Sequence, residues 1–402
     1  MALLPVADAI ARVLDGVGPL PVERVPLADA EGRVLAEDLS ARRTQPPANV
    51  SAMDGYAVSG TEVAQAPVAF RVIGEIAAGR PFGRPVGRSE AVRIFTGGVL
   101  PEGTDTVVIQ EHTTREGERV LVNKATATGK NVRVAGLDFR QGETRLKRGR
   151  RLTGRDVSLA AAMNHATLPV YRQPKVAVVA TGDELVPPGT EPGPGQIVHS
   201  NVFSIAALAR QSGAEVIDLG VLPDRLEETI GGLRRARELR ADVLVTAGGA
   251  SVGDYDLVQP ALAAEGVMPA FWKIAMRPGK PMMFALLDGM RVLGLPGNPV
   301  SAYVCSVLFL GPLIRTLTGR ADVALQVEEG ILGRDLREND ERAEYMRATL
   351  ALRDGAWVAT PFPNQDSSML VPLAAADCLV LREPLAPAAP AGSPCQFVKL
   401  DH

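Results

Sequence analysis

The sequence has little cysteine and little histidine. Its three cysteines, Cys305, Cys378 and Cys395, show no C-x-x-C spacing, and its four histidines form no H-x-x-x-H pair. These patterns exclude a disulfide framework and a zinc knuckle, and they favour a reducing compartment. Any metal is therefore expected to be a hard ion held by oxygen ligands rather than zinc or copper.

Aromatic residues, excess charge of one sign and long apolar runs are also scarce. There are 10 Phe, 5 Tyr and 2 Trp, and 43 basic residues stand against 46 acidic ones, for a net charge of −3. Such a chain has neither a strongly basic face for phosphates nor many rings for stacking bases, so nucleic-acid binding is not expected. The longest apolar run, Val300–Ile314, is too short to cross a bilayer and predicts a buried helix. Residues 1–20 lack a secretory signal pattern, and we expect a soluble, cytoplasmic protein with no membrane contact.

The length of 402 residues predicts two to four domains. Residues 5–16 have the apolar spacing of a helix, and residues 156–164 predict another helix, which we expect to pack on the first. Between about 45 and 145, glycine and proline separate short strand-like pieces, which indicates a β-rich domain. These pieces are Val68–Ile73, Ala91–Phe95, Thr106–Glu111 and Arg119–Asn123.

Residues 174–315 alternate between buried strands and helices. This alternation predicts βαβ units, with a mainly parallel sheet and helices on both of its sides. The predicted elements are the strands Lys175–Ala180, Glu215–Leu219 and Asp242–Thr246 and the helices Val202–Ser212 and Arg225–Leu239. After about residue 320, strand patterns return and predict a small β domain. Its strands are Ala324–Glu328, Tyr345–Leu352, Trp357–Thr360, Cys378–Arg382 and Gln396–Leu400.

Three strands of the α/β region end in glycine-containing loops, at residues 180–185 (ATGDEL), 246–256 (TAGGASVGDYD) and 294–301 (GLPGNPVS). Ligands of an open parallel sheet bind outside the carboxyl ends of its strands. Glycine lets the backbone approach a ligand, and exposed N–H groups favour an anion. One such loop is an ordinary connection, but three together predict an anion pocket.

The first two of these loops carry four acidic side chains, Asp183, Glu184, Asp254 and Asp256, and Asp224 follows the strand-like stretch Val216–Val221. Next to a phosphate-binding pocket they would repel the ligand unless a divalent cation lay between them. Mg²⁺ suits carboxylates and phosphate oxygens and needs no histidine. A single loop acid is more often a helix cap, and Asp183 fits that reading as well.

Basic side chains lie nearby in the segment 272–281 (WKIAMRPGKP). Pro278-Gly279 predicts a tight turn that brings Arg277 and Lys280 together, with Lys273 close by. The same residues also fit a solvated hairpin. The β-rich region has three polar glycine loops, at 46–57, 95–105 and 129–138, and the residues alone do not separate a binding role from ordinary turns there.

Seven stretches in one order resemble a single family, the molybdopterin molybdenumtransferases (the MoeA family, related to the C-terminal domain of gephyrin). They span nearly the whole chain. They are 51–57 (SAMDGYA), 95–98 (FTGG), 131–133 (NVR), 181–185 (TGDEL), 248–253 (GGASVG), 277–281 (RPGKP) and 295–301 (LPGNPVS).

The resemblance implies a multi-domain α/β plus β architecture in four parts. These are an elongated N-terminal segment (1–45 with 145–173), a β-rich inserted domain (46–144), an α/β/α molybdopterin-binding domain (174–318) and a C-terminal β domain (319–402). It also implies a homodimer whose active cleft lies between the α/β domain of one subunit and the insert of the other. Family members take adenylylated molybdopterin and molybdate, and release AMP and molybdenum cofactor in a Mg²⁺-dependent step.

Site residues follow from the matched motifs. Glu184 and Asp256 would bind Mg²⁺, although the family varies in this loop and Asp254 is an equal alternative to Asp256. The residues that would act in catalysis are Asp54, Asp138, Glu184, Asp224 and Asp256. Those that would bind substrate are Ser51, Thr96, Arg133, Thr181, Gly182, Gly248, Gly249, Ser251, Gly253, Lys273, Arg277, Lys280, Pro296, Gly297, Asn298, Pro299 and Ser301.

Two other functions remain open from the sequence. One is the preceding step, adenylylation of molybdopterin, although a lone α/β domain suffices for that and the extra domains argue against it. The other is a non-catalytic pterin-binding scaffold. Acids and basic residues in the matched loops favour catalysis, and the adenylyltransferase is a candidate protein partner.

Overall fold

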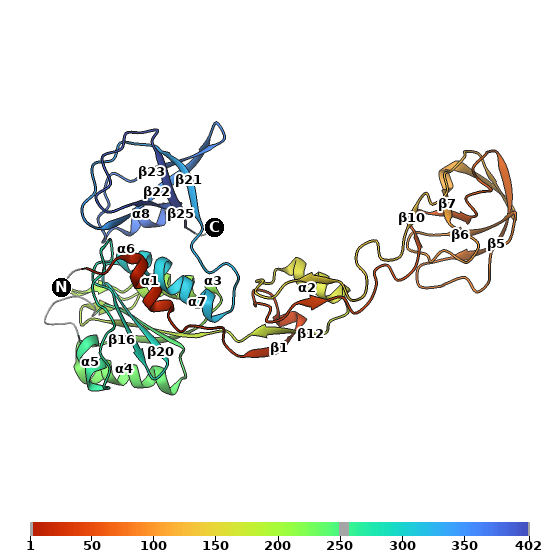
Figure 1. The fold of residues 1–402 in the computed structure, drawn as a ribbon. Coiled ribbons are helices and arrows are strands. Elements are labelled where there is room, and N and C mark those ends of the chain that lie inside the picture. The colour runs from red at the N-terminus through yellow and green to blue at the C-terminus, as the bar shows by residue number, and fades with distance from the viewer. Residues whose placement is uncertain (1–2, 249–256, 401–402) are drawn as a thin grey trace.

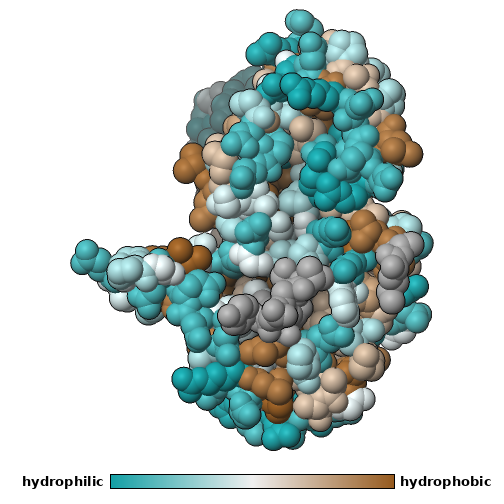
Figure 2. All heavy atoms as spheres, turned by 90° about the vertical axis from the view of Figure 1, so that its left-hand side faces the viewer, coloured by the Kyte–Doolittle hydropathy of each residue, from teal (hydrophilic) through white to brown (hydrophobic). Residues whose placement is uncertain are grey.

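The computed structural model describes residues 3–248 and 257–400. Figure 1 shows an elongated chain with a large body at one end, a narrow middle part and a β-rich body at the other end. The large body contains the α/β domain and the C-terminal β domain, and both termini lie there. Figure 2 looks onto this end, where two lobes present a mostly hydrophilic face with small hydrophobic groups.

The narrow middle part is built from two separate stretches of chain. Its two small antiparallel pairs run outward and back, β1 with β12 and β2 with β11. A capping box between Thr153 and Asp156 starts its helix. Its elements are β1 (Val22–Pro26), η1 (Leu27–Asp29), β2 (Leu39–Ser40), β11 (Thr144–Leu146), α2 (Gly154–Ala162) and β12 (Thr167–Tyr171).

The two helices of the N-terminal region do not pack together, so our expectation on this point is wrong. In α1 (Val6–Leu14), Ala9 and Val13 are buried in the core of the α/β domain. In α2, Ala160 packs instead in a separate cluster with Leu168 and Val170 of β12. Each apolar helix face is thus covered by a different core, and α1 ties the N-terminus to the α/β domain.

The β-rich body is a six-stranded sheet in the order β7-β4-β6-β5-β9-β8, with the short pair β3 and β10 beside it. All four strand-like pieces predicted in this region contain a strand, although the third ends at Ile109 because Gln110 and Glu111 belong to η2. The elements are β3 (Val50–Ser51), β4 (Gly55–Val58), β5 (Val68–Ile76), β6 (Glu90–Ile94), β7 (Thr106–Ile109), η2 (Gln110–His112), β8 (Thr113–Glu116), β9 (Arg119–Val122) and β10 (Val132–Arg133).

The α/β domain has a five-stranded sheet in the order β16-β13-β17-β20-β19, in which only β19 is antiparallel to its neighbour. Helices α3, α6 and α7 cover one face and α4 and α5 the other, as predicted. The elements are β13 (Lys175–Thr181), β14 (Leu185–Val186), β15 (Ile197–Val198), α3 (Asn201–Ser212), β16 (Glu215–Leu222), α4 (Leu226–Glu238), β17 (Val243–Ala247), α5 (Val258–Ala264), β18 (Met276–Arg277), β19 (Met283–Leu287), β20 (Met290–Leu295), α6 (Pro299–Cys305) and α7 (Gly311–Leu317).

The strand order places a crevice in this sheet. The chain passes from β13 to β16 on one side and then to β17 on the other side. At such a reversal the connections leave in opposite directions, and a crevice opens at the carboxyl ends of the two central strands. The loops after β13 and β17 are the first two of the three predicted glycine loops.

One long helix lies in the middle of the α/β core. It consists of α6, a π-helical turn at Ser306–Leu310 and α7. The 19-residue stretch Pro299–Leu317 is long and apolar enough to cross a membrane, but 83% of an 18-residue part of it is buried inside the protein. The apolar run predicted as a buried helix is therefore a core helix.

The C-terminal domain is a six-stranded sheet that includes β18 of the α/β domain, paired in parallel with β22. The predicted strand at 324–328 is mostly wrong: β21 begins at Val327, because Leu325 packs on the α/β core as part of the connection. The elements are β21 (Val327–Leu332), β22 (Ala343–Arg353), β23 (Ala356–Pro361), α8 (Leu370–Ala374), β24 (Cys378–Arg382) and β25 (Pro394–Lys399).

Candidate active site

A cavity of about 680 Å³ lies at the carboxyl ends of β13, β17 and β20. The loops after all three strands line it, together with the start of α3 and a loop of the C-terminal domain. Eight residues predicted from the sequence lie in its wall: Thr181, Gly182, Glu184, Asp224, Gly248, Gly297, Asn298 and Pro299. The structure thus brings these residues together around one cavity, and the anion-binding role expected for them stays a prediction.

Glycine is required where the loops meet. Gly248 has φ +106°, and a Cβ on it would lie 2.9 Å from the Thr181 carbonyl oxygen. A Cβ on Gly297 would lie 4.0 Å from the Gly248 Cα. Glycine is therefore required at 248, where a side chain would meet the backbone after β13, whereas a Cβ at 297 would make only an ordinary van der Waals contact.

The acids of the first loop have two different roles. Asp183 and Asp224 bond reciprocally: Asp224 N donates to Asp183 Oδ1 at 3.1 Å and Asp183 N donates to Asp224 Oδ2 at 3.4 Å. Asp183 therefore joins two loops and does not cap a helix, contrary to the alternative reading of the sequence. Glu184 is exposed toward the cavity, with its carboxylate folded over Gly182, where a Cβ would meet Glu184 Oε2 at 2.5 Å.

The cavity offers carboxylate oxygens to a hard cation. Glu184 and Asp224 both line it, and oxygen donors of this kind suit Mg²⁺. In the described part of the chain, no group of three potential ligand side chains is close enough to hold a metal. The other predicted ligands, Asp254 and Asp256, lie outside the described residues, as do Gly249, Ser251 and Gly253. The donors that are present fit magnesium in chemistry.

The start of α6 is anchored on both sides. Asn298 Nδ2 donates to Ser367 Oγ at 2.9 Å, and the backbone N–H of Val300 donates to the Ser367 carbonyl at 3.0 Å. From α3, Asn201 Nδ2 donates to the Gly297 carbonyl at 2.7 Å. These bonds fix the loop 296–299 between the α/β domain and the C-terminal domain. The predicted residues Pro296 and Ser301 are buried and do not line the cavity.

Several lining residues were missed by the sequence analysis: Ile197, Val198, His199, Ser200, Asn201, Ser368 and Leu370. The polar triplet 199–201 directly precedes a predicted helix, and this position could have pointed to the cavity. Ser368 and Leu370 come from a distant domain, and nothing local in the sequence indicates their role. The His199 ring stacks on the Phe203 ring. Among the described residues, neither the buried His199 Nδ1 nor the buried Thr181 Oγ1 has a hydrogen-bond partner.

The basic loop does not line this cavity. Arg277 forms ion pairs with Glu344 at 2.8 Å and with Asp340 at 3.4 Å, so it binds the C-terminal domain. Lys273 lies over the Trp272 ring, and Lys280 is exposed. The backbone N–H of Ile274 donates to the Lys280 carbonyl at 3.0 Å and closes a wider loop, so the tight turn predicted at Pro278-Gly279 is not the turn that this bond forms.

A second group of predicted residues lies in the β-rich body. Thr96 donates to Asp54 Oδ1 from both its backbone N and its Oγ1, each at 2.8 Å. These two bonds lower the pKa of Asp54, and the backbone bond has the larger effect. Ser51 is fully buried in β3, which pairs with β10 so that Val50 opposes Arg133. Asp138 lies beyond β10, where the chain returns to the middle part, and its backbone N–H donates to the Gln45 carbonyl at 3.1 Å.

The two groups are far apart within one chain. Figure 1 shows the β-rich body, with β10 and β6, at the opposite end from α3, α6 and the carboxyl ends of the central sheet. One copy of the chain therefore cannot bring Asp54 and Glu184 into one site.

Comparison with known proteins accounts for the whole architecture. Models of the MoeA N-terminal region (domains I and II), a probable molybdopterin-binding domain and the MoeA C-terminal region (domain IV) match residues 4–164, 177–316 and 329–400. The molybdopterin molybdenumtransferase of Bacillus subtilis is 34% identical over 94% of this chain and 90% of its own length, and that of Haemophilus influenzae is 39% identical over 79% and 78%. The crystal structure of a molybdopterin biosynthesis MoeA protein from Pyrococcus horikoshii superposes with a TM-score of 0.85 at 28% identity, with both chains fully covered. The chain belongs to the molybdopterin molybdenumtransferase family.

Proposed function

We propose that this protein inserts molybdenum from molybdate into adenylylated molybdopterin and releases AMP in a Mg²⁺-dependent step. The observation that carries the proposal is the cavity at the reversal point of the sheet, where Glu184 and Asp224 lie beside Gly182, Gly248 and Gly297. The names of the relatives support a molybdopterin substrate. We place the reaction in the cytoplasm, where the adenylyltransferase of the preceding step would supply the substrate.

The residues of the cavity suit a phosphorylated ligand. The loop at Gly248 packs closely on the backbone after β13, and the segment Gly297, Asn298 and Pro299 at the start of α6 lines the same space. Thr181 Oγ1 is a buried hydroxyl that could donate to a ligand atom. Mg²⁺ held by Glu184 and a partner acid would neutralise charge that develops as the phosphoanhydride breaks. The protein thus contributes orientation and electrostatics, while the substrate brings the sulfur ligands for molybdenum.

The working site would be shared between two subunits of a homodimer. Asp54, Thr96 and Arg133 lie at the far end of the chain from Glu184. A second copy related by a two-fold axis would bring its β-rich body to the cavity, and this arrangement gives two equivalent sites.

The metal assignment is tested with Glu184→Ala and the matched control Glu191→Ala. Glu191 is an exposed acid of the connection that follows Glu184 and does not line the cavity. With adenylylated molybdopterin, molybdate and Mg²⁺, we expect AMP release to be abolished in Glu184→Ala and unchanged in the control. Full AMP release from Glu184→Ala would refute the ligand assignment. If the wild-type protein instead adenylylates molybdopterin with ATP, or binds the pterin without any turnover, the proposed reaction is wrong.

The shared site is tested by mixing two inactive variants, Glu184→Ala and Asp54→Ala. After subunit exchange at equal amounts, half of the dimers are mixed, and each mixed dimer has one site with both residues intact. We expect about a quarter of the wild-type activity to return. Persistent inactivity, with subunit exchange verified by differently tagged chains, would contradict a site built from two copies.

A further inference from the structure

Two unlike groups of residues line the active-site cavity. Glu184, Asp224 and the glycine loops form one group, and the proposed magnesium and phosphate contacts belong to it. The other group contains Ile197 and His199, which come just before α3, and Leu370 at the start of α8. Ile197 and Leu370 are exposed, so part of the cavity wall is open apolar surface. The proposed reaction gives this second group no role so far.

His199 supplies the aromatic surface of the second group. Its ring stacks on the Phe203 ring, with the two ring centroids 5.4 Å apart and the ring planes at 20° to each other. Aromatic pairs prefer such an offset stack. Phe203 does not line the cavity and is 53% exposed, whereas its neighbours Val202 and Ile205 are buried in the core. His199 and Phe203 thus form a ring platform at the edge of the cavity.

The backbone fixes the ring platform next to the acidic loop. Strand β15 pairs with β14, so that Ile197 lies opposite Leu185, the residue after Glu184. The backbone N–H of Ile197 donates to the Glu184 carbonyl at 2.8 Å, and that of His199 donates to the Val186 carbonyl at 3.0 Å. These bonds hold the platform and the carboxylate at a fixed spacing, as a site for one ligand with two different ends requires.

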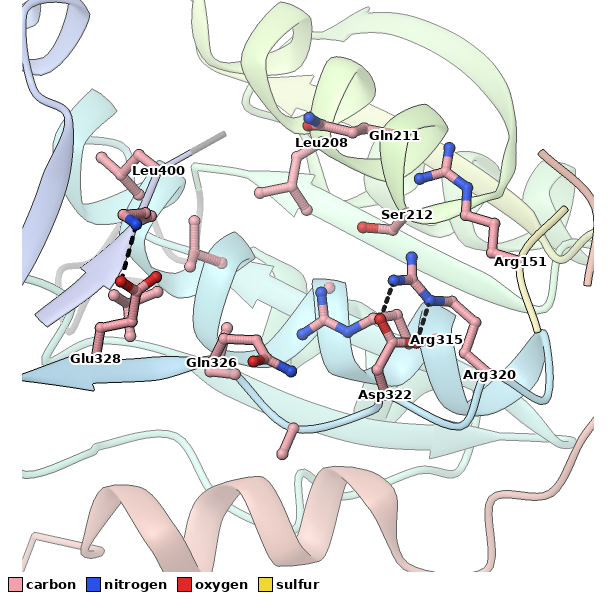
Figure 3. A pocket seen from close by; sticks show the side chains of 16 residues that line it. Arg151, Leu208, Gln211, Ser212, Arg315, Arg320, Asp322, Gln326, Glu328 and Leu400 are labelled. Carbon is pink, nitrogen blue, oxygen red and sulfur yellow. Dashed lines mark hydrogen bonds and ion pairs between the residues drawn. The ribbon is translucent and has the colours of Figure 1, made fainter. Parts of the chain in front are cut away.

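The other end of α3 borders a cavity of a different kind, of about 340 Å³ (Figure 3). Two ion pairs lie in its wall, Arg320 with Asp322 and Lys399 with Glu328. Among the described residues, no aromatic side chain lines it. The open aromatic surface of α3 therefore lies at its N-terminal end, on the side of the active-site cavity.

A flat ring of a ligand suits this surface. Phe203 covers one face of the imidazole, and because His199 lines the cavity, the opposite face is the one available to a ligand. Stacking accepts any flat π-system, since every such ring has a π-face. Ile197 and Leu370 offer apolar surface to the same ligand, and burial of that surface adds affinity.

We propose that His199, supported by Phe203, binds a flat nitrogen heterocycle of the ligand by stacking, and that this contact determines which ligands the cavity prefers. The identity of the ligand rests on the proposed function, because adenylylated molybdopterin carries two such heterocycles, an adenine and a pterin. His199 touches the ligand in this arrangement, and Phe203 is a positioning residue that acts through the imidazole.

The test is isothermal titration calorimetry of the full-length protein with Mg²⁺ and three probes: AMP, neopterin monophosphate and ribose 5-phosphate, which has no heterocycle. We expect His199→Ala to weaken at least one of the two ring-bearing probes about tenfold, while ribose 5-phosphate changes less than about twofold. The probe that weakens shows whether the platform binds the adenine or the pterin.

Conservative variants separate stacking from a purely structural role, since the same stack also closes the first turn of α3. His199→Phe keeps a ring at this position and should retain most of the affinity. Phe203→Ala should weaken the same probe by less, about threefold, because it only removes support from the imidazole. Phe203→Tyr keeps that support and should bind like the wild type.

The matched control is Leu286→Ala, which truncates an apolar side chain of the same domain that is 52% exposed and does not line the cavity. It should leave all three affinities unchanged. Unchanged binding of both ring-bearing probes by His199→Ala would overturn the proposal. An equal loss for ribose 5-phosphate would overturn it too, because the effect would then concern the whole cavity and not a ring.

Turnover separates this inference from the proposed reaction. With adenylylated molybdopterin, molybdate and Mg²⁺, His199→Ala should raise KM about tenfold and change kcat by less than about threefold, because the platform binds a part of the substrate that does not react. AMP release with an unchanged KM would refute the platform and leave the reaction standing. Absence of AMP release from the wild type, with the probe preferences intact, would refute the reaction and leave the platform standing.

Discussion

Replacement of the buried arginine of the C-terminal domain should loosen a wall of the active-site cavity. Arg347 is completely buried in β22, and its guanidinium donates to the carbonyls of Asn364, Asp366 and Met369. The segment 364–370 that it holds includes Ser367, the partner of Asn298, and Ser368, which lines the cavity. Arg347 therefore links the core of one domain to the ligand site of another.

The size of the effect follows from these contacts. Two of the three bonds are 2.9 Å long and the third, at 3.4 Å, is weak. A hydrogen bond from a charged group contributes about 1.5–3 kcal/mol, so two good ones contribute about 3–6 kcal/mol. Arg347→Met keeps most of the apolar stem of the side chain and removes the free-energy cost of burying a charge. The same burial lowers the pKa of Arg347. We expect a net loss of about 3 kcal/mol in stability of the C-terminal domain.

The assay is equilibrium unfolding in urea, followed by the fluorescence of Trp357. The chain has only two tryptophans, so a Trp272→Phe background leaves Trp357, in β23 next to β22, as a reporter of this domain alone. The control is Arg382→Met, which also removes bonds to three carbonyls, those of Arg337, Ala386 and Pro387, but from a partly exposed site. A loss below about 1 kcal/mol for Arg347→Met, or equal losses for the two variants, would refute the argument from burial.

Three further predictions concern charge, thiols and close packing. Hydrogen bonds from Arg84 and Arg71 lower the pKa of Glu90 from 4.5 to about 2. The contribution of Glu90 to stability is therefore present above pH 4.5 and lost as the pH falls through about 2. The difference in melting temperature between wild type and Glu90→Gln should close between about pH 5 and 2. Burial raises the pKa of the Cys378 thiol to about 12 and also raises the pKa of Cys395. A thiol reagent at about pH 8 should therefore react fully with these two cysteines only after the protein unfolds. Rapid labelling of the native protein would contradict this. Both Gly279 and Gly289 have positive φ, but only at 279 would a Cβ meet a buried sulfur, 2.6 Å from Cys305 Sγ. In thermal unfolding, Gly279→Ala should therefore destabilise the protein by about 1 kcal/mol or more beyond the control Gly289→Ala.

The sequence predicts the elements of this fold better than it predicts their contacts. The apolar strand at 175–180 and the glycine loops after it can be read locally, because strand periodicity and turn residues are local signals. Nothing local shows that Ser367 would bond to Asn298, since the two lie in different domains. The same limit explains the error over α2: an apolar helix face shows that a helix is buried but not against which core.

Arg277 illustrates how a charged residue in a matched motif can have a structural role as well. Its side chain bonds to Asp340 and Glu344, on the C-terminal domain, while its own strand, β18, is an edge of that domain's sheet. An arginine with two carboxylate partners has less positive charge to offer a substrate than the sequence suggests. Lys280, which directly follows Pro278-Gly279 and is exposed, keeps its charge available. If the basic loop attracts molybdate, Lys280→Gln should therefore weaken molybdate binding more than Arg277→Gln does, whereas Arg277→Gln should mainly loosen the contact between the two domains.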